Sequence, residues 1–384
     1  MTQPPILAVR RLTLTEFRNY RSLRLETGAR LLALVGANGA GKTNILEAIS
    51  LLSPGRGLRG VTLDELARQG GSGSWAIAAE IEAEHGPVSL GTAWNGKAGS
   101  GDSGGRQVVI DGEARKGSGA LGDYMRFLWL TPAQDRLFAG PASDRRRFLD
   151  RMVTASDPEH GARIAVFEKV MRERNLLLEE TRPDPGWLSS LEAHMAEAAV
   201  AISAARLVGL EALQTHIGEG RDTSSFPWAE VAVQGEIEAL VAQKPAVQVE
   251  DEYRRILRDS RSPDRAAGRT LRGPHRSDLE VVHGPKRKAA ALCSTGEQKA
   301  LLIGLVLAQA RAVQAGAGVP PVLLLDEVAA HLDRARRKSL LEALAALGSQ
   351  SWMTGTDAQL FEAIGEAGAI FHVEDGHVSK AVED

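Results

Sequence analysis

The sequence predicts an α/β fold: a mixed sheet, a small antiparallel β layer and an inserted helical domain. Three stretches support this fold class. The apolar run 31–35 passes through a glycine-rich turn into a helix-favouring segment. Residues 322–325 are aliphatic and end in the acids Asp326 and Glu327, the pattern of a strand buried within a parallel sheet. Between these two runs, a long segment places apolar residues at helical spacing.

The first third of the chain predicts short strands. Residues 6–14 and 23–26 have β-compatible spacing, and residues 15–20 between them are compatible with a solvated turn. Residues 75–83 alternate with period two, and residues 88–94 are a second candidate. Residues 108–110 lead into Asp111-Gly112, which is typical of a hairpin turn. These segments predict the antiparallel layer, with a Gly/Ser-rich loop at 99–105 and one more strand at 127–130.

From residue 141 the pattern becomes helical. Ser143 is the predicted N-cap of a first helix, and the sequence 182–186 breaks the helical pattern. A second helix has a short heptad seam made of Leu188, Leu191, Met195, Ala198, Ile202 and Ala205. Two helices of about thirty residues form a lever of roughly 45 Å. The chain is therefore expected to divide into head segments 1–140 and 268–384 and a helical insertion, 141–267.

The glycine-rich turn has the spacing G-x-x-x-x-G-K-T. It comprises Gly36, Ala37, Asn38, Gly39, Ala40, Gly41, Lys42 and Thr43. Glycines let successive backbone N–H groups point inward as an anion nest, and the N-terminus of the next helix adds partial positive charge. In this pattern the lysine reaches the β- and γ-phosphates and the threonine hydroxyl binds Mg²⁺. The turn therefore predicts a nucleotide phosphate site.

The composition limits the class of protein. Apolar residues make up 43% and charged residues 25%, as in ordinary globular proteins, and a net charge of −3 provides no global attraction to DNA or anionic lipid. The single cysteine, Cys293, excludes an internal disulfide and fits a reducing cytosol. The N-terminus has no signal pattern, and the most apolar run, 300–308, is too short to span a bilayer. We expect a cytoplasmic protein with a buried helix there.

Three later motifs complete the pattern. The sequence STGEQ at 294–298 opens a helix, Asp326 and Glu327 follow a strand, and AHLD at 330–333 comes next. Each motif is weak evidence alone: Ser294-x-x-Glu297 is also the pattern of a capping box, and two acids after an apolar strand are common. In this order, with a helical insertion between the halves, the chain resembles the ATP-binding cassette head of the SMC-like branch, and within it the RecF family. The matching segments run nearly end to end: 17–20 (FRNY), the phosphate loop, 145–150 (RRRFLD), 273–279 (GPHRSDL) and 294–299 (STGEQK).

The resemblance implies two heads that dimerise with ATP between them. Lys42 and Thr43 of one subunit are expected to hold the phosphates and Mg²⁺. Ser294 and Gly296 of the other are expected to contact the γ-phosphate at the start of their helix, which suits an anion. Glu297 belongs to the same expected ATP-binding segment.

The resemblance also implies the catalytic groups. Asp326 is expected to hold Mg²⁺ through water, and Glu327 to polarise the attacking water, with Lys42 as the third catalytic residue. Gln134 falls where such heads place a glutamine that senses Mg²⁺ and water. Cassette ATPases often have a histidine near Thr354, and its absence is compatible with slow turnover. The resemblance implies a weak DNA-dependent ATPase, but the sequence does not decide whether the chain is an enzyme.

The function implied is that of an ATP-dependent clamp that binds gapped, single-stranded and duplex DNA in replication and recombinational repair and helps load recombinase. RecR is the implied partner, with RecO and RecA indirectly. Candidate DNA contacts are arginines at 145–151, an arginine-rich run from 254 to 276, and residues 286–288. No aromatic residues interleave them, which favours backbone binding without sequence readout; a solvated helix face is equally open for each.

Two other functions are compatible with parts of this pattern. Another cassette-type ATPase is one: an SMC-like repair protein would need a longer insertion, and a transport-associated subunit fits poorly with a helical insertion and no membrane segment. The other is a non-hydrolysing nucleotide-dependent scaffold, against which Glu327 argues. A turnover measurement separates these two functions.

Overall fold

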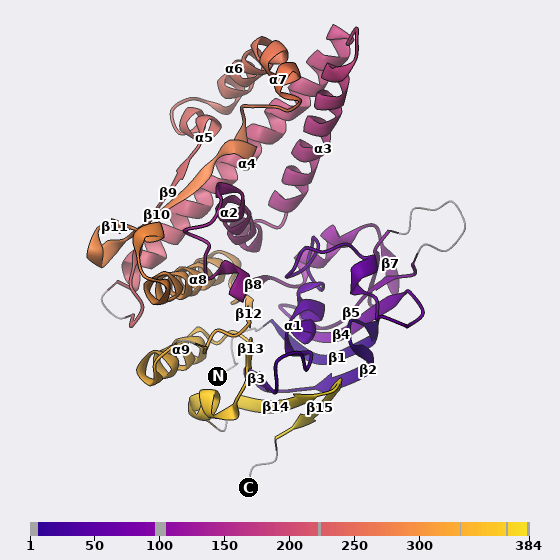
Figure 1. The fold of residues 1–384 in the computed structure, drawn as a ribbon, viewed down its shortest axis with the longest axis vertical. Helices are drawn as coiled ribbons and strands as arrows, with labels where there is room; N and C mark the ends of the chain where they lie inside the picture. The colour runs from indigo at the N-terminus through magenta and orange to yellow at the C-terminus, as the bar shows by residue number, and fades with distance from the viewer. Residues whose placement is uncertain (1–6, 97–104, 222–223, 331, 366–367, 382–384) are drawn as a thin grey trace. The chain divides into compact units, whose positions relative to one another are not determined.

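The computed structural model describes residues 7–96, 105–221, 224–330, 332–365 and 368–381. The chain divides into two compact units. Unit 1 comprises Met1–Asp135 and Leu302–Asp384, and unit 2 comprises Arg136–Leu301. The colours of Figure 1 show that unit 1 is built from both ends of the chain, and unit 2 from its middle.

Unit 1 contains a mixed six-stranded sheet that confirms the predicted fold class. Its order is β15-β14-β3-β13-β12-β8, and only the edge strand β15 runs antiparallel. The bounds are β3 Leu31–Val35, β8 Phe127–Leu130, β12 Val322–Leu325, β13 Ser351–Gly355, β14 Gly368–Glu374 and β15 His377–Lys380. β3, β12 and β13 are buried along their whole length, so their sequences do not alternate: β3 and β12 are apolar throughout, and β13 combines apolar residues with the buried hydroxyls of Ser351 and Thr354.

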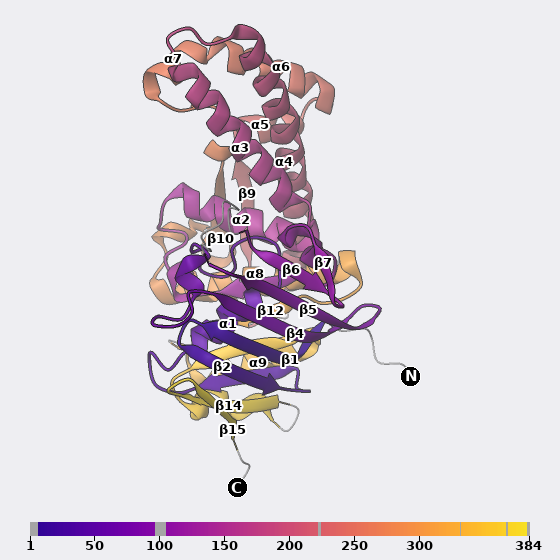
Figure 2. The same cartoon turned by 90° about the vertical axis from the view of Figure 1, so that its right-hand side faces the viewer.

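The antiparallel layer predicted for the first third of the chain is also present. A six-stranded sheet has the order β2-β1-β4-β5-β6-β7, and Figure 2 shows several of its strands side by side. The bounds are β1 Ala8–Phe17, β2 Tyr20–Glu26, β4 Trp75–Ala83, β5 Gly86–Trp94, β6 Gln107–Ile110 and β7 Glu113–Arg115. Asp111 and Gly112 both have positive φ, 50° and 83°, as a two-residue hairpin turn requires. The loop expected at 99–105 lies mostly outside the described residues.

The helices of unit 1 cover its sheets and include short 3₁₀ turns. They are α1 Lys42–Ser50, α9 Arg334–Leu347, η1 Asp64–Leu66, η2 Ser118–Asp123, η3 Pro132–Gln134 and η7 Ala358–Ile364. α1 begins directly at the end of the glycine-rich turn, with Gly41 as its N-cap. The sequence therefore places the turn between a buried strand and a buried helix.

Unit 2 is mainly helical, but its helices differ from the predicted pair of equal length. They are α2 Ala142–Ser156, α3 His160–Glu179, α4 Pro185–Glu219, α5 Glu236–Val241, α6 Ala246–Asp259 and α7 Arg261–Ala267. The first expected helix is split in two because Pro158 disfavours a helical conformation at Asp157, which is extended. The predicted cap at Ser143 is wrong, because the N-cap of α2 is Pro141, two residues earlier.

The second expected helix is α4, of 35 residues. Asp184 caps it by accepting from the backbone of Gly186 and Trp187, and Pro185 takes the first helical position. Its heptad residues from Leu188 to Ile202 are buried against neighbours in unit 2. In Figures 1 and 2, α3 runs alongside α4, and α6 and α7 lie at the end of this pair where α3 ends and α4 begins.

Unit 2 also has a small sheet that the sequence did not predict. It has the order β11-β10-β9, with β9 Ala229–Gln234, β10 Asp278–His283 and β11 Lys288–Ala289, all antiparallel. Three short turns accompany it: η4 Pro274–Arg276, η5 Gly284–Lys286 and η6 Ala290–Leu292. β9 and β10 lie far apart in sequence, so no local hairpin pattern marks them.

α8, Thr295–Ala317, is longer than the apolar run from which it was predicted, and it carries residues of both units. This helix of 23 residues is long and apolar enough to cross a membrane, judged by length and composition alone. However, 67% of its most apolar 18-residue stretch is buried inside the structure. The expectation of a buried helix at 300–308 is confirmed, and the helix continues beyond this run through the buried Gln309.

Candidate nucleotide site

The glycine-rich turn has a conformation that only glycine can adopt at two positions. Gly36 and Gly41 have φ of 154° and 110°. A Cβ on Gly41 would lie 2.5 Å from the Asn19 side-chain nitrogen, and one on Gly36 would lie 2.2 Å from the Val373 carbonyl oxygen. The turn is therefore packed closely from outside, which fixes the direction of its backbone N–H groups.

Lys42 lies over this turn. Its Nζ donates to the carbonyl oxygens of Gly36 and Ala37, each at 2.7 Å. Burial lowers the pKa of Lys42, while the nearby charges of Glu327 and Asp326 act in the opposite direction. The ammonium is thus held among neutral backbone oxygens beside the loop that is predicted to bind phosphate.

Residues 17–20 support the glycine-rich turn, so a solvated turn describes only Arg18 and Asn19 of this segment. Phe17 and Tyr20 are fully buried. The Tyr20 hydroxyl donates to the Gly41 carbonyl at 3.1 Å, and Asn19 Nδ2 donates to the Ala40 carbonyl at 3.2 Å. Aromatic residues flanking a polar pair were the available signal, but hydrophobic periodicity does not detect a turn that packs through side-chain hydrogen bonds.

The end of β12 brings Asp326 to the first residues of α1. The Thr43 hydroxyl lies 2.9 and 3.1 Å from the two carboxylate oxygens of Asp326. The two residues are 283 positions apart in sequence. A hydroxyl and a carboxylate are oxygen ligands of the kind that Mg²⁺ uses together with phosphate and water, so this pair fits the implied ion.

Thr354, at the end of β13, connects the two acids. Its hydroxyl donates to Asp326 Oδ1 at 2.7 Å and accepts from the Glu327 backbone N–H at 2.8 Å. Glu327 has φ of 49°, in the left-handed region. The sequence drew attention to Thr354 only because cassette ATPases often have a histidine near this position. The hydrogen bonds from Thr354 to the two acids were therefore not predicted.

Gln134 follows β8 at the same edge of the sheet. Its Oε1 accepts from the Thr131 backbone N–H at 2.9 Å, and this contact orients the side chain. Its Nε2 is buried and has no hydrogen-bond partner within the part of the chain that the structure describes. We define the nucleotide edge as residues 36–43, Gln134, Asp326, Glu327 and Thr354.

The STGEQ segment lies in unit 2 and begins α8 with a capping box. The Ser294 N–H donates to Glu297 Oε2 at 2.9 Å, and the Glu297 N–H lies 3.4 Å from Ser294 Oγ. Hydrogen bonds from Lys286 and from Ser294 lower the pKa of Glu297 to about 2. Ser294 and Gly296 are exposed, whereas the Glu297 carboxylate is engaged in the cap. His331 of the AHLD motif lies outside the described residues.

Comparison with known proteins decides the family. The model of the RecF/RecN/SMC N terminal domain matches residues 8–379. The DNA replication and repair protein RecF of Mesorhizobium japonicum is 49% identical over 370 residues, covering 96% of this chain and 97% of that protein. RecF of Brucella suis biovar 1 is 48% identical over 378 residues, covering 98% and 97%. The chain belongs to the RecF family.

Solved structures agree on the RecF fold. The structure of "the recombination mediator protein RecF-ATP in RecFOR pathway" has a TM-score of 0.85 at 23% identity and covers 99% of both chains. An Smc head domain from Pyrococcus furiosus has a TM-score of 0.53 at 17% identity, over 98% of this chain and 96% of that one. The expected SMC-like head is therefore confirmed as the fold.

The arginines at 145–151 are less available in this RecF-family chain than the sequence suggests. Arg145 forms a bidentate ion pair with Asp278, at 2.6 and 2.7 Å. Arg146 donates to the Ser277 carbonyl at 2.7 Å. Arg147 remains mostly exposed and pairs with Asp144. The cluster thus joins α2 to β10 more than it presents positive charge.

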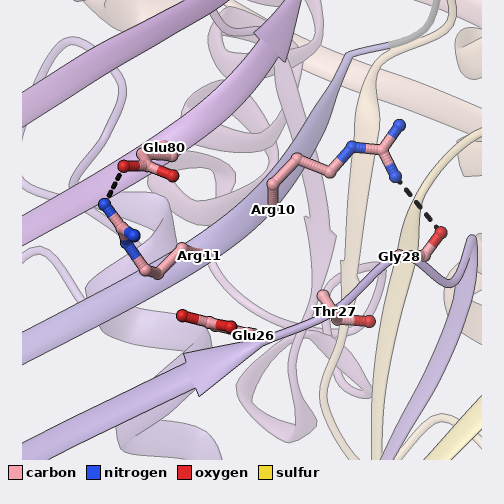
Figure 3. A pocket seen from close by; sticks show the side chains of 6 residues that line it. All are labelled: Arg10, Arg11, Glu26, Thr27, Gly28 and Glu80. Atoms are coloured by element: carbon pink, nitrogen blue, oxygen red, sulfur yellow. Dashed lines mark hydrogen bonds and ion pairs between the residues drawn. The ribbon is translucent and has the colours of Figure 1, made fainter.

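A separate depression of about 460 Å³ lies on the antiparallel sheet of unit 1, lined by Arg10, Arg11, Glu26, Thr27, Gly28 and Glu80. Figure 3 shows Arg11 paired with Glu80, and Arg10 donating to the Gly28 carbonyl. Two arginines face two glutamates, so the depression has no net charge. It offers no counterpart to the nucleotide edge.

Proposed function

We propose that this chain is an ATP-dependent DNA-binding protein of DNA replication and recombinational repair that dimerises on ATP and hydrolyses it slowly. One observation carries the proposal: Lys42, Thr43, Asp326 and Glu327, from opposite ends of the sequence, meet at the carboxyl ends of β3 and β12. Open α/β sheets bind ligands at that edge. The solved RecF-ATP structure that shares this fold supports ATP as the ligand.

Each ligand-facing residue of the nucleotide edge has a role in this proposal. The backbone N–H groups of residues 36–41 and the Lys42 ammonium bind the phosphates. Thr43 and Asp326 hold Mg²⁺, which neutralises charge on the phosphates when bound. Glu327 accepts a proton from the attacking water, and Gln134 donates to the water or phosphate through Nε2.

The second half of the site comes from another copy of the chain. Ser294 and Gly296 are exposed at the start of α8, where helix N–H groups favour an anion. We assign them to the γ-phosphate bound by the partner subunit. Glu297 then acts indirectly, by holding the Ser294 backbone in the capping box.

DNA is bound through its phosphates by exposed arginines and lysines of unit 2. With Arg145 and Arg146 paired internally, the exposed candidates include Arg147, Arg255, Arg258, Arg265, Arg269, Arg276, Arg287 and Lys288. Because the net charge is −3, one copy gives little general attraction, and a dimer that aligns two sets of cations gives more. RecR is the direct partner in this proposal, RecO and RecA act indirectly, and the site of action is the cytoplasm.

Sedimentation of two variants tests the dimer. Ser294→Arg should still bind ATP but stay monomeric, because the bulky side chain blocks the γ-phosphate contact. Glu327→Gln should bind ATP, lose turnover and accumulate as a dimer. Normal ATP-dependent dimerisation of Ser294→Arg would exclude this arrangement. A Glu327→Gln variant with the turnover of the unmodified protein would exclude the assigned base.

A salt titration with ATP, with ADP and without nucleotide tests the DNA contact. If the dimer neutralises about six phosphates, log K should fall with log salt at a slope near −5 on duplex DNA. Arg147→Gln should make the slope shallower, whereas Arg145→Gln should mainly reduce stability, since it leaves Asp278 without its bidentate partner. Salt-insensitive binding, or equal affinity in all three conditions, contradicts the proposal.

A further inference from the structure

We propose that Thr354 is the positioning residue that holds both acids of the nucleotide edge, so that it sets the rate of ATP turnover while nucleotide affinity depends on other groups. The inference rests on the proposed function and adds a residue to it. Thr354 touches neither phosphate nor water in this account. It acts through Asp326 and Glu327.

The position of Thr354 follows from strand order. β13 lies between β3, which leads into the phosphate loop, and β12, which ends at the acids (Figure 1). Thr354 pairs with Leu34 of β3, and the preceding residue, Met353, pairs with Leu325 of β12. Thr354 is therefore level with Asp326, and its side chain reaches the acid pair from the neighbouring strand.

The hydroxyl of Thr354 uses both of its hydrogen-bonding functions. Its proton is donated to Asp326 Oδ1 at 2.7 Å, and an oxygen lone pair accepts the Glu327 N–H at 2.8 Å. The side chain is fully buried, so water does not replace either contact. A single hydroxyl thus fixes the carboxylate of one acid and the backbone of the next.

The two acids depend on this hydroxyl to different extents. Asp326 also accepts from the Thr43 hydroxyl, and its own N–H donates to the Leu130 carbonyl at 2.8 Å. Glu327 has a left-handed backbone with φ of 49°, which residues other than glycine rarely adopt. The hydrogen bond to Thr354 opposes relaxation of this backbone on its N–H side, while the Glu327 carbonyl accepts from the Ala330 N–H at 3.2 Å. Loss of the hydroxyl should therefore displace Glu327 more than Asp326, and should impair turnover more than binding.

The test uses two substitutions at this position and a matched control on the same strand. Thr354→Val keeps the volume but removes the hydroxyl, and Thr354→Ser keeps the hydroxyl. Ser351→Ala removes another fully buried hydroxyl of β13, one that has no hydrogen-bond partner in the described part of the chain. Single-turnover rates and the Kd of a labelled ATP analogue are measured for all three, with thermal unfolding as a check on folding.

Thr354→Val should lower turnover about ten- to a hundredfold, the effect of one or two lost buried hydrogen bonds, with Kd within about threefold of the unmodified protein. Thr354→Ser and Ser351→Ala should stay within about threefold in both quantities. In the Glu327→Gln background, where turnover is already lost, Thr354→Val should still leave the Kd within about threefold. Unchanged turnover of Thr354→Val, or an equal loss of turnover and affinity, overturns the inference.

Hydrogen exchange gives a readout that does not require turnover. The Glu327 amide should exchange faster in Thr354→Val than in the unmodified protein, and at an unchanged rate in Thr354→Ser. Equal exchange in all three proteins overturns the inference. If the unmodified protein has no turnover at all, the proposed hydrolysis fails while exchange still decides the role of Thr354.

Discussion

The nucleotide edge of unit 1 and the buried ion pairs of unit 2 use charged side chains in opposite ways. In unit 2, Arg174 is fully buried and donates to Asp264 at 2.7 Å and to Glu192 at 3.2 Å. Arg261 completes the set at Glu192, at 2.6 Å. We call Arg174, Glu192, Arg261 and Asp264 the arginine spine. It joins α3, α4 and α7, so its charges are neutralised within unit 2.

At the nucleotide edge, by contrast, the hydrogen bonds of Lys42 and Asp326 are made with neutral groups. Lys42 donates to two carbonyl oxygens, and Asp326 accepts from the hydroxyls of Thr43 and Thr354. Such contacts orient a charge without neutralising it, so the charge is still available to a ligand of opposite sign. Charges paired inside the chain stabilise the fold, and charges held by dipoles are the better candidates for binding.

Lys42→Met should produce the largest change, because the ammonium is the cation that the phosphates meet. We expect ATP affinity to fall about a hundredfold or more, as for loss of one partner from a buried charge pair. Stability should not fall, since burial already opposes the charged form. A labelled ATP analogue measures affinity, and Lys338→Met, an exposed lysine of α9, is the control. Unchanged ATP affinity in Lys42→Met would show that the Lys42 charge does not bind the phosphates.

Arg174→Met should reverse this pattern, with loss of stability and little change in the ATP affinity of the folded protein. Removing it leaves the buried Asp264 with the Leu271 N–H but without its ion-pair partner, which costs about 3–5 kcal/mol. Arg261→Met is the matched variant: it is partly exposed and leaves Glu192 paired with Arg174, so about 1 kcal/mol is expected. Hydrogen exchange across α3 and α4 in urea measures both. Equal losses of stability in the two variants would show that the buried Arg174 contributes no more to the arginine spine than the partly exposed Arg261.

The same contrast explains which features the sequence could predict. The strands 31–35, 75–83 and 127–130 were predicted with the observed bounds, because the spacing of apolar residues within a short segment indicates a strand. The glycine-rich turn was equally readable, since its geometry requires glycine at fixed places. The pairing of Arg145 with Asp278 was not, because the two lie 133 residues apart and only the folded chain brings them together.

Residues that act on other residues were missed for a related reason. Thr354, Asn19 and Tyr20 carry no charge and belong to no motif with a known ligand contact. Each makes its contribution through one or two hydrogen bonds to the nucleotide edge or its loop. Sequence patterns identify the groups that meet a ligand more readily than the groups that position them.

Glu297 lies between the two classes, and its pH dependence should show the smallest effect. It is in an expected binding segment but is paired with Lys286 and with the Ser294 backbone. Its pKa is about 2 in the folded chain, below the ordinary value of 4.5. A carboxyl whose pKa is lowered by folding stabilises the fold fully above about pH 4.5, and this contribution is lost as pH falls toward 2.

Glu297→Gln can still accept the Ser294 N–H but cannot pair with Lys286. The difference in thermal unfolding temperature between the unmodified protein and this variant should therefore be small and constant from pH 8 to 5, and should close between about pH 4.5 and 2. Glu211→Gln, an exposed position on α4, is the control. A difference that changes between pH 8 and 6 would point to a histidine instead, and would mean that the Glu297 pair does not hold the start of α8. If the expected profile is found, Glu297 groups with the arginine spine as a charge neutralised within the fold, and Ser294 and Gly296 remain the ligand-facing part of that segment.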